Sequence, residues 1–385
     1  MLQKLVGLRI LRGKPLLLGG IVLGVTLLVS VVLALIVVPA QQSQATTRTY
    51  YVAADEVDWD YAPSDMNDIT GEEFGEEEDV FVQQGPERIG KVYRKALYRE
   101  YTDETFTELK PPPAEQEHLG TLGPLLRGEV GDSIEVVFKN NTDFPVSLHP
   151  HGVFYEKDSE GAPYEDGASD EEDTGDAIAA GQMHTYQWEI PERAGPGPQD
   201  PSSIMWMYHS HVDEPGDTNA GLIGPIIVTR NGMTKEDGMP EDVDREFITM
   251  FAVFDENRSN YLEENIQTFA GSPRSVDPEE DDFKESNLMH TINGFVFGNM
   301  PMMTTNEGER VRWYLMSMGS EVDLHTPHWH GNTVLKQGMR TDVSDLLPAE
   351  MQVADMVPDD PGVWFYHCHV NDHIDAGMTA RYTVV

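Results

Sequence analysis

The chain contains two copies of one pattern, in which short sequences typical of β-strands lead to pairs of histidines. In each copy, one His-x-His pair follows an early strand and a second pair lies on a later strand, with Gly and a closing strand after it. These pairs are His149 and His151 with His209 and His211, then His328 and His330 with His367 and His369. Each copy spans about 145 residues, which is a usual domain length. The repeat therefore predicts two similar domains.

The body of the chain consists of short runs in which apolar and polar residues alternate, and Gly, Pro, Asn and Asp interrupt these runs. Residues 133–138, 224–228, 310–315 and 380–384 are examples, and no long stretch has a helical period. Strands at such regular spacing are typical of an all-β sandwich or barrel. We predict an all-β fold with two tandem Greek-key β-sandwich domains at residues 86–230 and 241–385. Residues 231–240, rich in Gly and acidic side chains, would join them.

The N-terminal region differs from this body. Residues 15–39 contain no charged side chain. This uncharged run has about the length of one transmembrane helix. Basic residues precede this run, and acidic residues dominate after it. We therefore expect residues 1–40 to form a short cytoplasmic segment and a transmembrane anchor in the cell membrane, with the catalytic body outside the cell. Residues 41–85 are polar and acidic, and we predict a solvated stalk there. A cleaved signal peptide is the alternative to a single-pass anchor.

The chain has 67 acidic and 26 basic residues, a formal charge of -41. Such a surface repels nucleic acid and anionic lipid, and it favours cations as substrates or cargo. Either adaptation to high salt or simple solubility by net charge accounts for it. An acidic insert at residues 156–176 is expected to be a solvated loop; the alternative is a Ca²⁺ site that includes Glu172 and Asp176.

The single cysteine, Cys368, cannot form an internal disulfide. On a strand it points to the opposite face from its neighbours His367 and His369, so one strand serves two sites. Two histidines, a thiolate and a weak axial methionine make a blue-copper site, a set that His325, Cys368, His373 and Met378 supply. Eight clustered imidazoles remain, the number that a three-copper cluster needs. Ten of 13 histidines fall in these clusters, a pattern that chance does not explain.

The four clusters resemble, in order, the four copper-binding motifs of multicopper oxidases. From about residue 91 onward the sequence also resembles one two-domain unit of ceruloplasmin and hephaestin. The supporting stretches include residues 101–106, 118–124, 152–161, 208–213 and 292–294. This resemblance implies that both domains are cupredoxin domains.

The resemblance also implies a role for each ligand of four copper ions per chain. The blue-copper set above would hold the type 1 ion, and Cys368 would pass electrons through its own backbone to His367 and His369. The eight other histidines would hold the cluster: His149 and His328 the type 2 ion, His151, His209 and His369 one type 3 ion, and His211, His330 and His367 the other.

The first domain has no cysteine, so its histidines must meet those of the second domain across an interface. In the family, six such domains close a ring with the cluster between the first and the last. A chain with two domains would close this ring as a homotrimer. The alternative is a cluster formed within one chain.

The electron donor is predicted from residues near the blue-copper ligands. By resemblance, Glu285, His290 and Asp372 match the ferrous-iron site of ceruloplasmin-like ferroxidases, and Glu321 matches an acidic position on the same approach. Carboxylates favour Fe³⁺ over Fe²⁺, which assists electron loss. The sequence therefore predicts an oxidoreductase that oxidises Fe²⁺ and reduces O₂ to water.

Four alternatives stay open at this point. A laccase-like phenol oxidase would use the same copper set. An oxidase of Cu⁺ or Mn²⁺ is another, and Met300, Met302 and Met303 are soft ligands that suit Cu⁺, although core packing also explains them. A copper nitrite reductase needs fewer imidazoles than are present. A non-enzymatic binding module, such as the related coagulation-factor A domains, would have lost copper motifs that are intact here.

Overall fold

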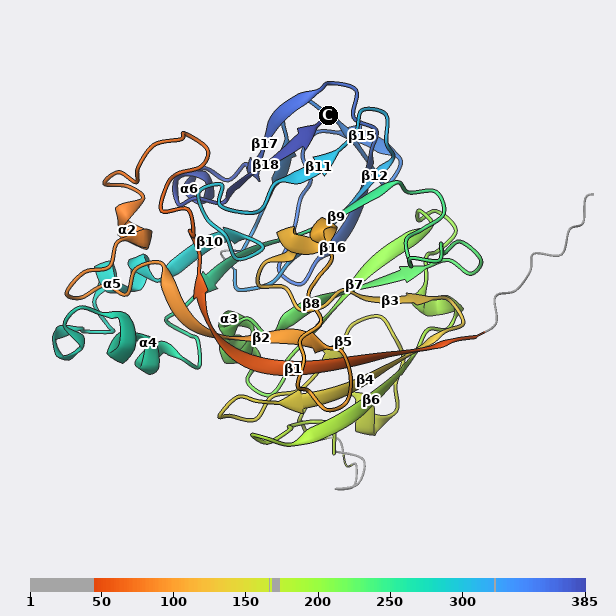
Figure 1. The fold of residues 1–385 in the computed structure, drawn as a ribbon, viewed down its shortest axis with the longest axis horizontal. Helices are drawn as coiled ribbons and strands as arrows, with labels where there is room; N and C mark the ends of the chain where they lie inside the picture. The colour runs from red at the N-terminus through yellow and green to blue at the C-terminus, as the bar shows by residue number, and fades with distance from the viewer. Residues whose placement is uncertain (1–44, 166, 168–173, 322) are drawn as a thin grey trace, which may run out of the picture. The chain divides into compact units, whose positions relative to one another are not determined.

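A computed structural model describes residues 45–385, except 166, 168–173 and 322. The predicted membrane anchor, residues 1–40, lies outside these described residues. Within the described part, none of the helices has both the length and the apolar character that a membrane crossing requires. The fold is mostly β-structure with a few short helices, as the alternating strand patterns predict. Figure 1 shows the strands and the helices that flank them.

The first half of the chain forms two four-stranded sheets. One has the order β2-β1-β4-β6, and the other has the order β3-β8-β7-β5. The strands of the first sheet are β1 (Thr47–Asp60), β2 (Val92–Tyr101), β4 (Ser133–Asn140) and β6 (Met183–Glu189). Those of the second are β3 (Leu126–Glu129), β5 (His149–Pro150), β7 (Ser203–His209) and β8 (Ile223–Thr229).

The second half forms a six-stranded sheet, β10-β9-β12-β16-β14-β15, and a four-stranded sheet, β11-β18-β17-β13. The larger sheet contains β9 (Arg245–Asp255), β10 (Leu288–Ile292), β12 (Val311–Ser317), β14 (Val334–Lys336), β15 (Met339–Thr341) and β16 (Met351–Met356). The smaller contains β11 (Met303–Thr305), β13 (Pro327–Trp329), β17 (Gly362–Cys368) and β18 (Thr379–Val384). The strands expected at residues 133–138, 224–228, 310–315 and 380–384 are confirmed as β4, β8, β12 and β18.

Buried side chains join the two sheets of each half. Trp188 and Tyr208, from opposite sheets of the first half, belong to one core cluster. Trp313 and Tyr366 do the same in the second half. A third cluster joins the halves, with Met207 and Met250 among its members. This shared core holds the two copies of the repeat in one fixed arrangement.

The expectation of a solvated stalk at residues 41–85 is wrong from Thr47 onward. Strand β1 lies inside the first sheet, antiparallel to β2 and parallel to β4. Val52, Ala53 and Ala54 are completely buried. Acidic composition suggested a solvated segment, but the acidic side chains alternate with small and aromatic ones that fit a buried sheet. The first domain therefore begins well before residue 86.

Within the described residues, five short α-helices flank the strands. They are α2 (Asp79–Val82), α3 (Glu214–Ala220), α4 (Leu262–Phe269), α5 (Asp281–Ser286) and α6 (Asn371–Asp375). Figure 1 shows α2, α4, α5 and α6 on one side of the strands, near β10. Helix α6 begins at Asn371, soon after β17 ends at Cys368, so the last histidine motif spans a strand end and a helix.

Candidate metal centre

Equivalent strand pairs place the histidines of the two copies. In the first half, His149 on β5 stands opposite His209 on β7. In the second half, His328 on β13 stands opposite His367 on β17. Because side chains at i and i+2 share a face of an extended strand, each pairing gathers four imidazoles. The structure thus repeats the sequence pattern at the level of single residue pairs.

The first quartet consists of His149, His151, His209 and His211. Its ring centroids lie 5.1 Å apart for His149 and His211 and 5.2 Å apart for His151 and His209. The Nε2 atoms of His151 and His209 are 3.1 Å apart. Two nitrogen ligands about 2 Å from one metal ion lie roughly 3 Å from each other. The spacing therefore fits a shared ion.

The second quartet consists of His328, His330, His367 and His369. The Nε2 atoms of His330 and His367 are again 3.1 Å apart. Ligand atoms of His328, His330 and His367 lie within 4.8 Å of one another. Among the described residues, histidine ring contacts of this kind join members of one quartet and never the two quartets. Each quartet is therefore half of the predicted eight-histidine set.

Backbone carbonyls fix the orientation of several of these rings. The Nδ1 atoms of His149 and His328 donate to the carbonyls of Glu160, at 2.7 Å, and Asp342, at 2.8 Å. His367 donates in the same way to the carbonyl of Cys368, at 2.7 Å. A carbonyl only accepts, so Nδ1 carries the proton and Nε2 keeps its lone pair for a metal.

A glycine follows the first histidine pair of each copy because an indole packs against it. Gly152 and Gly331 both have φ of +73°, a conformation that side chains disfavour. A Cβ at Gly152 would lie 2.1 Å from the ring of Trp206, and one at Gly331 would lie 2.4 Å from the ring of Trp364. This close approach holds the turn after each pair in the same shape.

The mononuclear site assembles as the alternation of β17 predicts. Cys368 is completely buried and points away from the second quartet, toward His325 and His373. Its Sγ lies 4.0 Å from Nδ1 of His325 and 3.5 Å from Nδ1 of His373, and these two nitrogens are 3.1 Å apart. Met378 is also completely buried and belongs to the same core cluster as Cys368.

The protonation of these groups suits metal binding. Burial raises the pKa of Cys368, but hydrogen bonds from His325 and His373 outweigh it and lower the pKa to about 6. Burial lowers the pKa of His151 to about 4 and that of His209 to about 3. At neutral pH the mononuclear site therefore offers a thiolate, and the first quartet offers neutral imidazoles, the forms that bind metal. His325 differs: burial lowers its pKa, but hydrogen bonds with Asp323 and Cys368 outweigh burial and raise the pKa.

Sequence reasoning missed Asp323. Its carboxylate is buried, and its Oδ1 lies 3.3 Å from Nε2 of His325, so that this nitrogen donates and Nδ1 faces the thiolate. The backbone N–H groups of Val253 and Ser320 also donate to it, each at 2.8 Å. The signal was present in Asp323-x-His325, because side chains two residues apart share a face of an extended segment.

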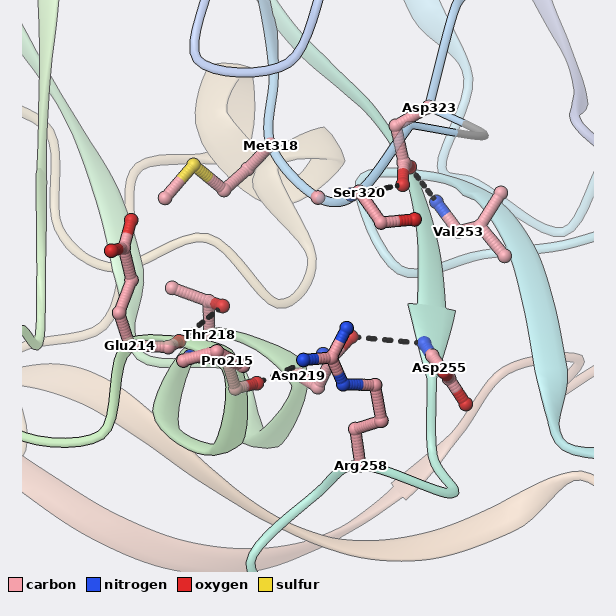
Figure 2. Close-up of a pocket in the computed structure, with 11 residues that line it drawn as sticks. Glu214, Pro215, Thr218, Asn219, Val253, Asp255, Arg258, Met318, Ser320 and Asp323 are labelled. Atoms are coloured by element: carbon pink, nitrogen blue, oxygen red, sulfur yellow. Dashed lines mark hydrogen bonds between the residues drawn. The ribbon is translucent and has the colours of Figure 1, made fainter.

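A pocket of about 220 Å³ lies on the other side of Asp323. Figure 2 shows Asp323, Met318 and Ser320 on one side of it and Glu214, Thr218 and Asn219, from α3, on the other. Asp255 and Arg258 complete the charged part of its lining. Because Asp323 contacts His325, the pocket lies one side chain from the mononuclear site.

The predicted iron ligands come together only in part. The ring of His290 lies 5.2 Å from that of His373, so it adjoins the mononuclear site. Glu285 lies in the last turn of α5, and Asp372 precedes His373 in α6. The side chains of Glu285, Asp372 and Glu321 are all exposed. Within the described residues, the carboxylates of these three do not gather with His290 into a group whose ligand atoms lie within 4.8 Å.

His290 is ready to act as a ligand. Its Nδ1 donates to the carbonyl of Leu288 at 2.9 Å, which leaves the Nε2 lone pair available. Burial and the neighbouring His373 lower its pKa to about 4, so the ring is neutral at physiological pH.

The predicted calcium site is described only in part: Glu172 lies outside the described residues, while Asp176 is described and buried. Calcium binding there stays a prediction.

Comparisons with known proteins agree with this donor set. Residues 119–232 and 271–385 match two sequence profiles that are each described as "Multicopper oxidase". The chain is 46% identical over 344 residues to Ferroxidase HEPHL1 of Mus musculus, covering 88% of this chain and 29% of that protein. Human hephaestin is 44% identical over 89% of this chain and 30% of its own length, and human ceruloplasmin is 43% identical over 88% and 31%. The chain thus spans about a third of the length of these relatives.

Solved structures show the same fold. A multicopper oxidase crystal structure has a TM-score of 0.55 at 17% identity and covers 90% of this chain and 93% of its own. A copper nitrite reductase from Nitrosomonas europaea has a TM-score of 0.54 at 16% identity, with 88% and 94% covered. Identity at this level establishes the fold and does not choose between activities. The paired sequence profiles do establish the family: this chain belongs to the multicopper oxidases, and it is similar in sequence to ceruloplasmin and hephaestin.

Proposed function

We propose that this chain oxidises Fe²⁺ and delivers the electrons to O₂, which is reduced to water. The observation that carries the proposal is the buried thiolate site with His290 beside it. His290 is a neutral imidazole 5.2 Å from the ring of His373. Glu285 is exposed on α5, which contacts β10, and Asp372 is exposed on α6, next to His373 in sequence. A ferroxidase, hephaestin and ceruloplasmin are among the relatives, which supports iron as the donor.

The proposal includes four copper ions per chain, and the donor set fits them. Thiolate with two imidazoles and a methionine suits a type 1 ion, and the two quartets suit one type 2 and two type 3 ions. When bound, copper supplies one-electron storage and the site of O₂ reduction. The assignment of each histidine in the quartets remains as the resemblance implies.

Cys368 connects the two sites through its own strand. Its side chain belongs to the mononuclear site, while the flanking His367 and His369 belong to the second quartet. The carbonyl of Cys368 also accepts a hydrogen bond from Nδ1 of His367 at 2.7 Å. Electrons that enter at the thiolate therefore have a covalent path and a hydrogen-bonded path to the quartet.

The proposed iron site would combine hard carboxylate oxygens with one neutral imidazole nitrogen as ligands. Glu285 and Asp372 offer hard oxygen ligands that favour Fe³⁺, and His290 offers a neutral nitrogen. Asp372 is the immediate neighbour of the copper ligand His373, so electron transfer would cross a short distance. Glu321 lies on the turn that precedes Asp323, and it would attract the cation from outside.

We further propose that the eight-histidine cluster forms between chains of a homotrimer, each chain being a pair of cupredoxin domains. Each quartet is half of the set within one chain, and His330 is exposed. Exposed apolar side chains lie near both metal sites of the second domain: Val343 pairs with His328 of the second quartet, and Leu324 and Leu347 flank the bridge between His325 of the mononuclear site and Leu346. A closed ring would cover these side chains and complete every cluster.

We also propose export to the outside of the cell with an N-terminal membrane anchor. The support is the uncharged run at residues 15–39, preceded by basic residues, and the acidic surface that follows. Labelling of intact cells with a reagent that cannot cross membranes tests this. Reaction of the folded body with the reagent is expected, whereas protection until lysis contradicts it.

The test of the iron site compares two reductants in the wild-type protein and in two variants. We expect Glu285→Ala to lower kcat/KM for Fe²⁺ by about tenfold or more, a loss of about 1.4 kcal/mol of transition-state stabilisation. Turnover of a phenol should be unchanged, because the blue-copper site is intact. Glu279→Ala, which removes an exposed carboxylate paired with Lys284, is the control. Equal loss with both reductants, or loss with neither, would sink the proposal.

A phenol oxidase is the second candidate, and the pocket beside Asp323 favours it. This space of about 220 Å³ lies one side chain from His325 and has room for a small organic reductant. Oxidation of Cu⁺ has less support, because Met300 and Met303 are buried in the core and only Met302 is exposed. If phenol turnover exceeds iron turnover and falls when the pocket is filled by Thr218→Trp, this candidate replaces the ferroxidase.

A further inference from the structure

A segment of the first domain reaches over the site that the second domain supplies. We call residues 62–91, between β1 and β2, the roof segment. Its two ends meet where the N–H of Tyr61 donates to the carbonyl of Lys91 at 3.0 Å. Its helix α2 packs against α5, and Figure 1 shows both helices beside β10. Helix α5 carries Glu285, and strand β10 carries His290.

Several bonds tie the roof segment to the second half of the chain. The N–H of Asp68 donates to the carbonyl of Phe297 at 2.9 Å, and its carboxylate lies 3.4 Å from the guanidinium of Arg381. The N–H of Ser64 donates to Oδ1 of Asn299 at 2.8 Å, and Nδ2 of Asn299 donates to the carbonyl of Met66 at 3.0 Å. The segment is therefore a fixed part of the second domain's surface.

Phe81 of the roof segment contacts His290 directly. The two ring centroids are 5.9 Å apart and the planes meet at 73°, an edge-to-face arrangement. Phe81 is 7% exposed and shares a buried cluster with Phe283 of α5. His290 is thus confined by Phe81, by the ring of His373 and by the bond from its Nδ1 to Leu288, and its Nε2 is the atom left for a ligand.

The outer face of the roof segment is negative. Glu72, Glu73, Glu76 and Glu77 are exposed there, and α5 adds Asp281 and Asp282 at its start. The basic residues of the segment are engaged: Lys91 pairs with Asp60 and Asp65, and Arg88 donates to the carbonyl of Asp79. A surface of one sign raises the local concentration of cations and their rate of arrival.

We infer that the roof segment makes the oxidation site selective for small cations, with Phe81 as the residue that positions His290. The inference rests on the proposed iron site and names residues that would favour a hydrated divalent cation over a neutral reductant there. Phe81 acts by holding the imidazole in one orientation, and the four exposed glutamates act on the approach. Neither group takes part in electron transfer, so a neutral reductant should be indifferent to both.

The first test is Phe81→Leu, which keeps an apolar side chain and removes the ring edge. We expect KM for Fe²⁺ to rise about fivefold, with the phenol KM, the blue colour and the reduction potential of the type 1 site unchanged. Phe81→Tyr, which keeps the ring, should restore the wild-type KM. Unchanged iron kinetics in a folded Phe81→Leu protein, or equal loss with both reductants, would overturn the inference.

The second test does not depend on core packing. Changing Glu72, Glu73, Glu76 and Glu77 together to Gln should lower kcat/KM for Fe²⁺ about threefold at low salt and flatten its salt dependence. The control changes Glu104, Glu108, Glu189 and Glu192 to Gln, an equal change of charge at exposed positions elsewhere. Equal effects of the two variants would show that only net charge matters and would remove the roof segment's role.

The outcomes also separate this inference from the function on which it rests. If Glu285→Ala leaves iron oxidation intact, iron is oxidised elsewhere and both ideas fall. If Glu285→Ala abolishes iron oxidation while the Phe81 and glutamate variants behave as wild type, the iron site stands and the roof segment is only structural.

Discussion

At the scale of single residues, the clusters of histidines with Cys368 were predictable from the sequence, and the residues that support those clusters were not. His-x-His and His-Cys-His are local patterns, and strand alternation alone sends Cys368 and its two neighbours to different sites. The roles of Asp323 and Phe81 could not be predicted from the sequence, for two different reasons. Asp323 is one acid among 67, and its meaning depends on a hydrogen bond to His325. Phe81 meets His290 across about 200 residues of sequence, a contact that only the fold creates.

Asp323 leads to a prediction about the mononuclear site. Both carboxylate oxygens of Asp323 face hydrogen-bond donors: Ser320 N–H on one side, and Val253 N–H with His325 Nε2 on the other. In Asp323→Asn, the amide nitrogen would therefore oppose a donor on one of these sides, and the negative charge would be lost. We expect the reduction potential of the type 1 copper to rise by on the order of 60 mV, which is a tenfold change for a one-electron couple. A redox titration measures it, with Asp255→Asn as the control from the same pocket. An unchanged potential would show that Asp323 does not tune the site.

At the scale of elements, periodicity identified strands wherever alternation was clear, as in β4, β8, β12 and β18. It failed for β1, because the run contains Asp55, Asp58 and Asp60 and follows a segment that reads as an anchor. The partners of β1 also could not be predicted. One is β2, the next strand, but the other is β4, which pairs with it in parallel after a long intervening sequence. Such non-local pairing leaves no local trace in sequence.

The position of β1 is testable by stability. Val52→Asp places a charge at a completely buried position between β2 and β4, and we expect it to cost about 3 kcal/mol or more. Thr47→Asp, at the exposed start of the same strand, should cost little. Thermal unfolding followed by circular dichroism compares the two. Equal melting temperatures would mean that residues 47–60 form a detachable stalk after all.

At the scale of the molecule, the repeat predicted two halves of similar build, and four sheets in two pairs are what the structure shows. The sequence did not predict how the halves are held together. Met207 and Met250 in the shared core, and Lys95 with Glu256 buried between β2 and the end of β9, fix that arrangement. In the proposed homotrimer, the meeting of two quartets would depend on surfaces of more than one chain, and contacts within one chain do not specify those surfaces.

Buried histidines give the copper-free protein a defined response to acid. Burial lowers the pKa of His118 to about 4 and that of His209 to about 3, from an ordinary value of 6.5. The unfolded chain therefore binds more protons than the folded one below pH 6.5, and stability falls as pH decreases from there toward 4. Each such group costs about 1.4 kcal/mol per pH unit in that window. Melting temperatures across the range should fall, and less steeply in His118→Gln; a flat profile would contradict the burial of neutral imidazoles.

The central claim is that one strand joins a thiolate site to a histidine cluster. Copper content and electron paramagnetic resonance of the purified, copper-loaded protein and of Cys368→Ser test it most directly. The account predicts a blue wild-type protein with about four copper ions per chain, and a colourless variant that has lost one of them. A colourless wild-type protein, or a variant that stays blue with its copper complement intact, would contradict it.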